Sequence, residues 1–266
     1  MNTSHLHAIA EEFDFDAPVT GIETLGQGFI NDTYVVTTER SRYILQRKNH
    51  NIFPDVPAMM DNIARVTAHL KAKVKAAGGN PEREVLTVVP TRDGALYHRD
   101  GENFWAASLF IDGSVTHDVA NTHRLAYMGG KGIGKFQAML ADFTEPLAEI
   151  IKGFHNIRWR FEQWDATLAA DPAGRVKDVQ EEIAFVRARA DRYGMISEAL
   201  ESGKIPTRIC HNDCNLNNIL FDFDTRTPLC VIDLDTIMPG ACAYDFGDSI
   251  RFGVKHVGFC FIVLVL

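Results

Sequence analysis

The fold of this 266-residue chain is decided by the stretch Ile209-Cys210-His211-Asn212-Asp213-Cys214-Asn215-Leu216-Asn217-Asn218-Ile219-Leu220. Apolar runs at residues 208–210 and 219–223 flank its polar centre, and a third run, at residues 229–232, ends at Asp233. Short apolar runs bounded by polar turns are typical of buried strands. The stretch therefore predicts a polar loop mounted between two strands, with a carboxylate at the end of a third.

Four polar residues of this region follow the order of a phosphoryl-transfer site. His211, Asp213 and Asn218 fit H-x-D-x-x-x-x-N, in which the aspartate accepts the proton of the attacking hydroxyl and the asparagine holds Mg²⁺. A second carboxylate must reach the same ion, because the ion bridges two phosphates, and Asp233 suits that task. Alternatively, Asp213 and its neighbouring asparagines are ordinary turn formers that bond to nearby backbone.

Two later segments extend the pattern, namely Met238-Pro239-Gly240 and Tyr244-Asp245-Phe246-Gly247-Asp248. Together with the polar loop they resemble the aminoglycoside phosphotransferase and choline kinase superfamily. That resemblance makes Asp245 a brace of the catalytic loop and His211 a second support. Asp245 or Asp248 could also cap a helix start, where a carboxylate meets free N–H groups, and both roles are compatible.

The resemblance covers most of the chain and implies an α+β, protein-kinase-like fold in two lobes. A β-rich nucleotide-binding lobe with its hinge is expected at residues 1–112, and a helical lobe with the catalytic and metal loops at residues 113–253. ATP and Mg²⁺ are the implied cofactors, with Asp213 as the catalytic base. Asn218 and Asp233 are the implied metal ligands.

Two glycines, Gly26 and Gly28, precede a strand-like segment near the N-terminus. Gly26 and Gly28 sit between an apolar run and a strand-like segment, where glycine lets the backbone approach phosphates. A plain tight turn explains the same spacing. The resemblance adds Asn31 to the nucleotide site. It also places Phe110 and Ile111 in the hinge, where backbone groups would meet the adenine edge.

The strand at residues 43–46 is where the kinase pattern expects a lysine for the phosphates. Gln46 aligns with that position and Arg47 is its cationic neighbour. Successive strand side chains point to opposite faces, so only one of the two can face the nucleotide, and the sequence leaves open which one. We expect Lys48 to be solvated.

Two more segments have helical character. Met59, Ile63, Val66 and Leu70 recur at three- and four-residue steps, which predicts an amphipathic helix from Val56 to Lys75. The glycine-rich run at residues 128–135 lacks the order of a phosphate loop and a preceding strand, so we expect close helix packing there.

Several segments look most like N-acetylhexosamine 1-kinases. They are residues 25–34, 43–47, 133–137, 154–156 and 232–240. The resemblance implies phosphorylation of the anomeric hydroxyl of N-acetylglucosamine or N-acetylgalactosamine, with an amino sugar as the small-molecule partner. The same chemistry on an aminoglycoside, choline or homoserine is one alternative. A catalytically inactive nucleotide-binding remnant is another.

The composition excludes other classes of function. The formal charge is −8 and no long basic run is present, so nucleic acid is not an expected partner. The first residues lack a secretory signal, which favours the cytoplasm, where ATP is available. Five cysteines, all after residue 209, form neither a disulfide framework nor the paired spacing of a zinc site.

The resemblance stops at residue 253, whereas family members continue with helices that wall the sugar pocket. Residues 254–266 are a largely apolar tail, too short for a membrane-spanning helix, which needs about 20 residues. We therefore expect no membrane partner. Our hypothesis is a truncated or frame-shifted product, which would leave the acceptor site incomplete.

Overall fold

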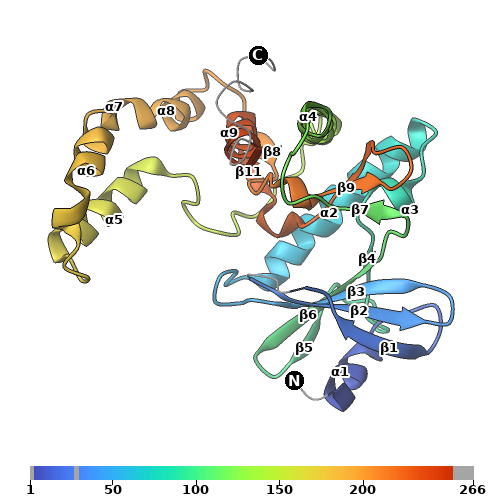
Figure 1. The fold of residues 1–266 in the computed structure, drawn as a ribbon. Coiled ribbons are helices and arrows are strands. Elements are labelled where there is room, and N and C mark those ends of the chain that lie inside the picture. Colours follow the sequence, from blue (N-terminus) through green and yellow to red (C-terminus); the bar gives the residue numbers. More distant parts are fainter. Residues whose placement is uncertain (1–2, 27–29, 254–266) are drawn as a thin grey trace.

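The computed structural model of this protein describes residues 3–26 and 30–253. An antiparallel sheet with helices against it forms the N-terminal half, and small sheets among helices form the C-terminal half (Figure 1). The predicted α+β class is confirmed. Gly28 and the apolar tail at residues 254–266 lie outside the described residues.

Six strands form the N-terminal sheet, in the order β1-β2-β3-β6-β4, with β5 paired to β6. The helix α1 (Thr3–Ala10) packs against one face, where Tyr43 and Leu45 of β3 are buried. The alternation along β3 therefore turns Gln46 and Lys48 to the opposite face. The strands are β1 (Val19–Thr24), β2 (Asp32–Thr38), β3 (Arg42–Lys48), β4 (Val88–Val89), β5 (His98–Asp100) and β6 (Asn103–Leu109).

The long helix α2 (Val56–Ala76) packs behind the sheet, as its apolar spacing predicts. It begins at a cap in which Asp55 accepts a 3.0 Å hydrogen bond from the N–H of Ala58. Its buried face shares one hydrophobic core with Ile209 and Leu234 of the C-terminal half. The short helix α3 (Pro81–Glu84) follows it. This shared core joins the two halves of the molecule.

Small sheets build the C-terminal half, in the orders β10-β9-β7 and β11-β8. The predicted polar loop lies between β8 and β9, and the predicted third strand is β10. The elements are β7 (Ser114–Val115), α4 (His123–Met139), β8 (Arg208–Cys210), η2 (Leu216–Asn218), β9 (Ile219–Asp222), β10 (Pro228–Val231), η3 (Leu234–Thr236), β11 (Met238–Gly240) and α9 (Cys242–Gly253).

Glycines of α4 pack closely against the strands around the polar loop. A Cβ on Gly129 would lie 2.7 Å from Cδ1 of Leu216, and one on Gly132 would lie 3.1 Å from Cβ of Pro228. Real Cβ atoms are rarely this close to neighbouring atoms, so the helix approaches only because these side chains are absent. Helix packing is thus the observed use of the glycine-rich run.

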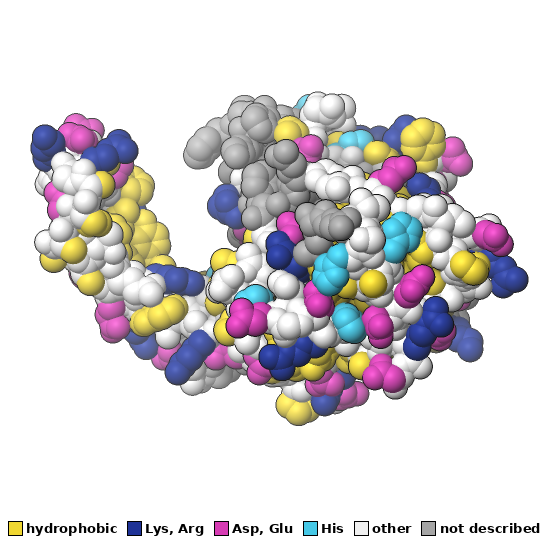
Figure 2. Space-filling model, turned by 90° about the horizontal axis from the view of Figure 1, so that it is seen from below, with side chains coloured by type: hydrophobic (Ala, Val, Ile, Leu, Met, Phe, Trp, Pro, Cys, Tyr) yellow, Lys and Arg dark blue, Asp and Glu magenta, His cyan; other side chains and the backbone are white. Residues whose placement is uncertain are grey.

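Four helices and a 3₁₀ turn at residues 157–201 form what we call the helical arm, which stands off the rest of the molecule (Figures 1 and 2). None of its elements contains a buried residue. They are α5 (Ile157–Ala170), η1 (Val176–Val179), α6 (Gln180–Arg187), α7 (Ala190–Tyr193) and α8 (Met195–Glu201). Within the described residues, no helix is both long and apolar enough to cross a membrane.

Candidate active site

His211 anchors the polar loop through hydrogen bonds on both ring nitrogens. It is fully buried, its Nδ1 accepts from the N–H of Asp213 at 3.2 Å, and its Nε2 lies 2.9 Å from the carbonyl oxygen of Ile232. Since a carbonyl can only accept, Nε2 donates to Ile232. The hydroxyl of Thr236 also donates to the carbonyl of His211 at 2.6 Å. The loop is thereby tied to the segment that follows β10.

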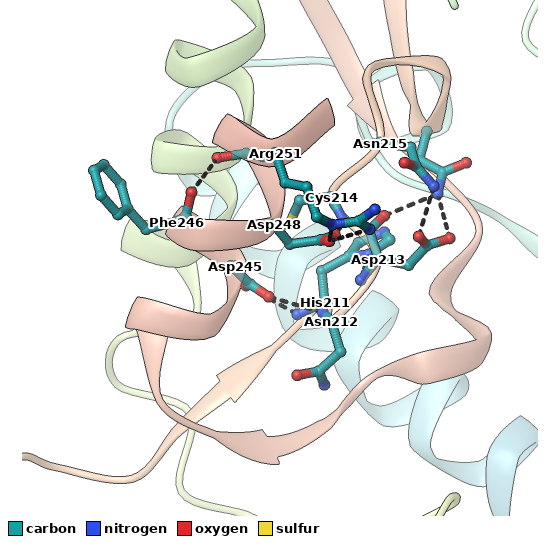
Figure 3. A network of polar contacts seen from close by, with 11 residues as sticks. His211, Asn212, Asp213, Cys214, Asn215, Asp245, Phe246, Asp248 and Arg251 are labelled. Carbon is teal, nitrogen blue, oxygen red and sulfur yellow. Dashed lines mark hydrogen bonds and ion pairs between the residues drawn. The ribbon is translucent and has the colours of Figure 1, made fainter. Parts of the chain in front are cut away.

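Asp213 lies in a pocket of amide groups from its own loop (Figure 3). Its Oδ1 accepts from Nδ2 of Asn215 at 2.6 Å, and its Oδ2 accepts from Nδ2 of Asn218 at 3.0 Å. The same Nδ2 of Asn218 donates to the Asp213 carbonyl at 2.9 Å, and Oδ1 of Asn218 accepts from no other described residue. Burial raises the pKa of Asp213, and the contacts with His211 and Asn218 partly offset this rise.

Asp245 and Asp248 reach from α9 to the backbone of the loop (Figure 3). Asp245 is fully buried, and its two oxygens accept from the N–H groups of His211 at 3.0 Å and Asn212 at 2.8 Å. Gln137 of α4 donates to the same carboxylate at 3.1 Å. Asp248 accepts from the N–H of Cys214 at 2.7 Å. Carboxylates therefore accept hydrogen bonds from three backbone N–H groups of the loop, those of His211, Asn212 and Cys214.

The loop needs this support because Asn212 has φ 66°, in the left-handed region that costs free energy for a residue with a side chain. Asn212 offsets the cost by donating from Nδ2 to the carbonyls of Cys210 at 3.1 Å and Thr236 at 2.9 Å. Asp233, at the end of β10, is also left-handed, with φ 57°. One of these left-handed residues directly precedes Asp213, and the other is the predicted metal ligand Asp233 itself. Unusual backbone conformations are common at functional sites.

Asp233 opens into a cavity of about 340 Å³ between the two halves. Asp233 is exposed to this cavity, and desolvation by the protein around it, together with repulsion from Asp235, raises its pKa to about 6, although Lys48 and His211 act against the rise. Asn218 lines the same cavity. The other polar residues lining it include Gln46, Lys48, Ser108, Ser114, Thr116 and Asp235.

The face of β3 that meets the cavity corrects one expectation. Lys48 is buried, not solvated, and its Nζ lies 2.7 Å from both Oδ1 of Asp235 and Oε1 of Gln46. Gln46 also faces the cavity. Arg47 points to the other face, where it pairs with Asp32. Side chains alternate along a strand, so Lys48 lies on the same face of β3 as Gln46 and is buried in the cavity wall.

The other predicted nucleotide residues lie at different distances from the cavity. Phe110 and Ile111 line it directly. The N–H of Phe110 donates to the carbonyl of Arg42 at 3.0 Å, whereas that of Ile111 donates to no other described residue. Gly26 has φ 63°, which glycine tolerates without strain. Asn31 does not line the cavity itself and donates to Oδ2 of Asp235, which does, at 2.7 Å.

Among residues 3–26 and 30–253, no three His, Cys, Asp or Glu side chains are grouped as a metal site. Cys210, Cys214 and Cys230 are buried free thiols, and burial raises their pKa, which disfavours the thiolate that zinc requires. The Asp233 carboxylate and Oδ1 of Asn218 are oxygen donors on residues that line the cavity. Such oxygens suit Mg²⁺, which takes few protein ligands and completes its shell with phosphates and water.

Comparison with known families gives one match that covers most of the chain. The profile of the phosphotransferase enzyme family matches residues 21–258.

Solved structures share the fold at low sequence identity. An aminoglycoside phosphotransferase from Alicyclobacillus acidocaldarius is similar over 92% of this chain and 70% of its own, with 15% identity and a TM-score of 0.59. A microcompartment-associated aminopropanol kinase has 17% identity and a TM-score of 0.59, over 94% and 74% of the two chains. A spectinomycin phosphotransferase in complex with ADP and spectinomycin has 15% identity and a TM-score of 0.55, over 95% and 78%. The two-lobed, protein-kinase-like fold is thereby confirmed.

Proposed function

The chain belongs to the phosphotransferase enzyme family, and from that premise we propose that it transfers the γ-phosphoryl group of ATP to the anomeric hydroxyl of an N-acetylhexosamine. The observation that carries the proposal is the position of three residues beside one cavity. Asn218 and Asp233 line it, and Asp213 lies one hydrogen bond behind Asn218. We place the nucleotide lobe at residues 1–112 and the catalytic lobe at residues 113–253, in a protein that works in the cytoplasm.

Asp213 is the proposed base. Its carboxylate takes the proton of the sugar hydroxyl as that oxygen bonds to the γ-phosphorus, while the bond from phosphorus to the bridging oxygen breaks and ADP leaves. A carboxylate with a raised pKa accepts a proton more readily than an ordinary one, and burial raises the pKa of Asp213. The amides of Asn215 and Asn218 hold its two oxygens in place.

Asp233 and Asn218 would hold Mg²⁺, which neutralises charge on the phosphates when bound. Asp233 lines the cavity, and desolvation together with the neighbouring Asp235 carboxylate raises its pKa, so a bound cation would favour its charged form. Nδ2 of Asn218 donates to Asp213, and among the described residues no group donates to Oδ1 of Asn218. Both groups are hard oxygen donors, so the residues fit this ion.

The nucleotide would lie along the cavity between the hinge and these oxygens. The N–H of Ile111, which donates to no other described residue, would face the edge of the adenine ring. Ile44 and Leu220 are apolar residues that line the cavity. Lys48, in place of Arg47, is the cation on the cavity side of β3. His211 and Asp245 support the loop without facing the cavity, and Asn31 acts through Asp235.

The amino sugar as acceptor is supported by the sequence segments that resemble N-acetylhexosamine 1-kinases. The test is Mg²⁺-dependent ADP release from ATP with N-acetylglucosamine, N-acetylgalactosamine, kanamycin, choline and homoserine, with Asp213→Asn as the control. Selective turnover of an N-acetylhexosamine supports the proposal, and turnover of another compound reassigns the acceptor. ATP binding without any turnover favours a nucleotide-binding remnant.

A further inference from the structure

Lys48 is paired with a carboxylate from the other half of the molecule. Its Nζ lies 2.7 Å from Oδ1 and 3.0 Å from Oδ2 of Asp235, and each of these side chains is only 5% exposed. Burying a charge this deeply is costly unless a counter-charge accompanies it. The Lys48 ammonium therefore depends on Asp235 for its place in the cavity wall.

The helix behind the sheet does not supply this counter-charge. In protein kinases the strand lysine pairs with a glutamate of that helix. Here the helix is α2, and it turns Met60 and Ile63 towards the cavity. Asp61 is the one carboxylate within α2, all of which the structure describes; it is 53% exposed and pairs with Arg65 of the same helix. In this protein Asp235, and not a carboxylate of α2, pairs with the lysine.

Asp235 also joins segments that are far apart in the sequence. It lies on η3, which begins directly after Asp233. Asn31, which follows the glycine turn, donates to Oδ2 of Asp235 at 2.7 Å, and its own Oδ1 accepts from the N–H of Asn49 at 3.0 Å. One carboxylate thus fixes the lysine of β3 and the segment after the glycine turn relative to Asp233.

We propose that Asp235 is the positioning residue for Lys48, which it holds where the lysine can reach the phosphates of a bound nucleotide. The inference rests on the proposed function, because it assigns Lys48 to those phosphates. The third contact of Nζ, to Oε1 of Gln46 at 2.7 Å, lies on the cavity side. A phosphate oxygen can replace Gln46 there without breaking the ion pair with Asp235.

The test is a double-mutant cycle read by the affinity for ADP with Mg²⁺, measured by calorimetry on the whole chain. We expect Lys48→Met and Asp235→Asn each to weaken binding about tenfold or more, as the loss of a charge-assisted contact does. The double variant should stay within about twofold of Lys48→Met, because Asp235 acts only through the lysine. An additive loss, or an unaltered Asp235→Asn, overturns the proposal.

Two further variants complete the cycle. Asp61→Asn is the matched control, since it removes the carboxylate that α2 offers, and it should leave ADP affinity unchanged. Asp235→Glu keeps the charge and moves it by one methylene; if Asp235→Asn does not fold, this variant takes its place in both backgrounds. The smaller loss of ADP affinity that Asp235→Glu causes should also disappear when Lys48→Met is present. A purely structural role, or direct metal binding, would keep the loss in that background and overturn the inference.

The cycle also separates this inference from the proposed function. If the wild-type protein binds ADP and the cycle is additive, the positioning role fails and the kinase proposal stands. If the wild-type protein binds no ADP, the proposed function fails and this inference is overturned with it. Sugar turnover does not enter the readout, so the identity of the acceptor cannot decide the outcome.

Discussion

The catalytic segment at residues 208–251 and the helical arm at residues 157–201 are built in opposite ways. In the catalytic segment, His211 and Asp245 are fully buried and the backbone of the loop is bonded by carboxylates. No helix or 3₁₀ turn of the arm contains a buried residue, and apolar side chains lie along the side that faces the body (Figure 2). The difference indicates that buried contacts of the core hold the residues of the polar loop in place. Packing within the arm does not contribute to their position.

Asp213→Asn should have the largest effect. The variant keeps the shape of the side chain and removes its ability to take a proton, so we expect kcat to fall by about 10²- to 10⁴-fold. ADP affinity should stay within about twofold, because Asp213 does not line the cavity. Steady-state ADP release and calorimetry measure the two quantities. Near wild-type turnover would remove Asp213 as the base.

The wild-type rate should also show an acid limb. In the complex with Mg²⁺ and both substrates the base must be deprotonated, so kcat falls as the pH drops through the pKa of Asp213, which burial raises. The limb should therefore lie at a higher pH than an ordinary aspartate gives.

Asp245→Ala should destabilise the protein strongly. Two buried N–H groups, those of His211 and Asn212, would lose their acceptor, at about 1–3 kcal/mol each. Urea unfolding of the nucleotide-free protein measures the loss. A matched control is Asp248→Ala, which removes the acceptor of a single backbone N–H, that of Cys214, and should cost about half as much. Equal costs for both variants would mean that Asp245 is not the principal brace.

The polar loop between β8 and β9 could be predicted from the sequence because its signal is local. His211, Asp213 and Asn218 lie within eight residues, and the flanking runs indicated strands that the structure contains as β8 and β9. The helix α2 was predictable for the same reason, through its periodic apolar residues. Each of these patterns is complete within a short window.

Contacts between distant segments could not be predicted in that way. Asn31 and Asp235 are 204 residues apart, and Lys48 and Asp235 are 187 apart, so no window holds both partners. The left-handed backbone of Asp233 is likewise set by its tertiary surroundings. A helical lobe was expected at residues 113–253, but the lack of burial in the helices of the arm was not predictable. That property depends on where the arm stands relative to the body.

Gly132→Ala tests the contact between α4 and the strands of the catalytic segment. The added methyl would lie 3.1 Å from Cβ of Pro228 and 3.3 Å from Cγ2 of Ile219, both on strands, so we expect a loss of about 1 kcal/mol in unfolding free energy. Gly130→Ala is the matched control on the same helix. It meets no atom within 4 Å, and it should stabilise the protein by about 0.5–1 kcal/mol. A gain in both variants would show that the packing is loose.

Asp233→Asn should stabilise the nucleotide-free protein. A carboxyl group whose pKa is raised to about 6 in the folded state carries a penalty when charged, so the penalty is present above pH 6. We expect a gain of about 1 kcal/mol at pH 7.5, reduced by the water that reaches the cavity. The gain should shrink as the pH falls from 6 towards 4. Urea unfolding at several pH values measures it, and a destabilised variant at pH 7.5 would contradict the penalty for the charged Asp233 carboxylate.

Met195→Ala in the arm should have the smallest effect on stability. The side chain is 61% exposed, and we expect a change below about 0.5 kcal/mol. Met59→Ala is its matched partner in the core, where the same truncation of a fully buried side chain should cost about 2–5 kcal/mol. Urea unfolding compares the two. If Met195→Ala approached the cost of Met59→Ala, the arm would be packed against a surface in solution, and the contrast between a self-supporting catalytic core and an unpacked arm would fall.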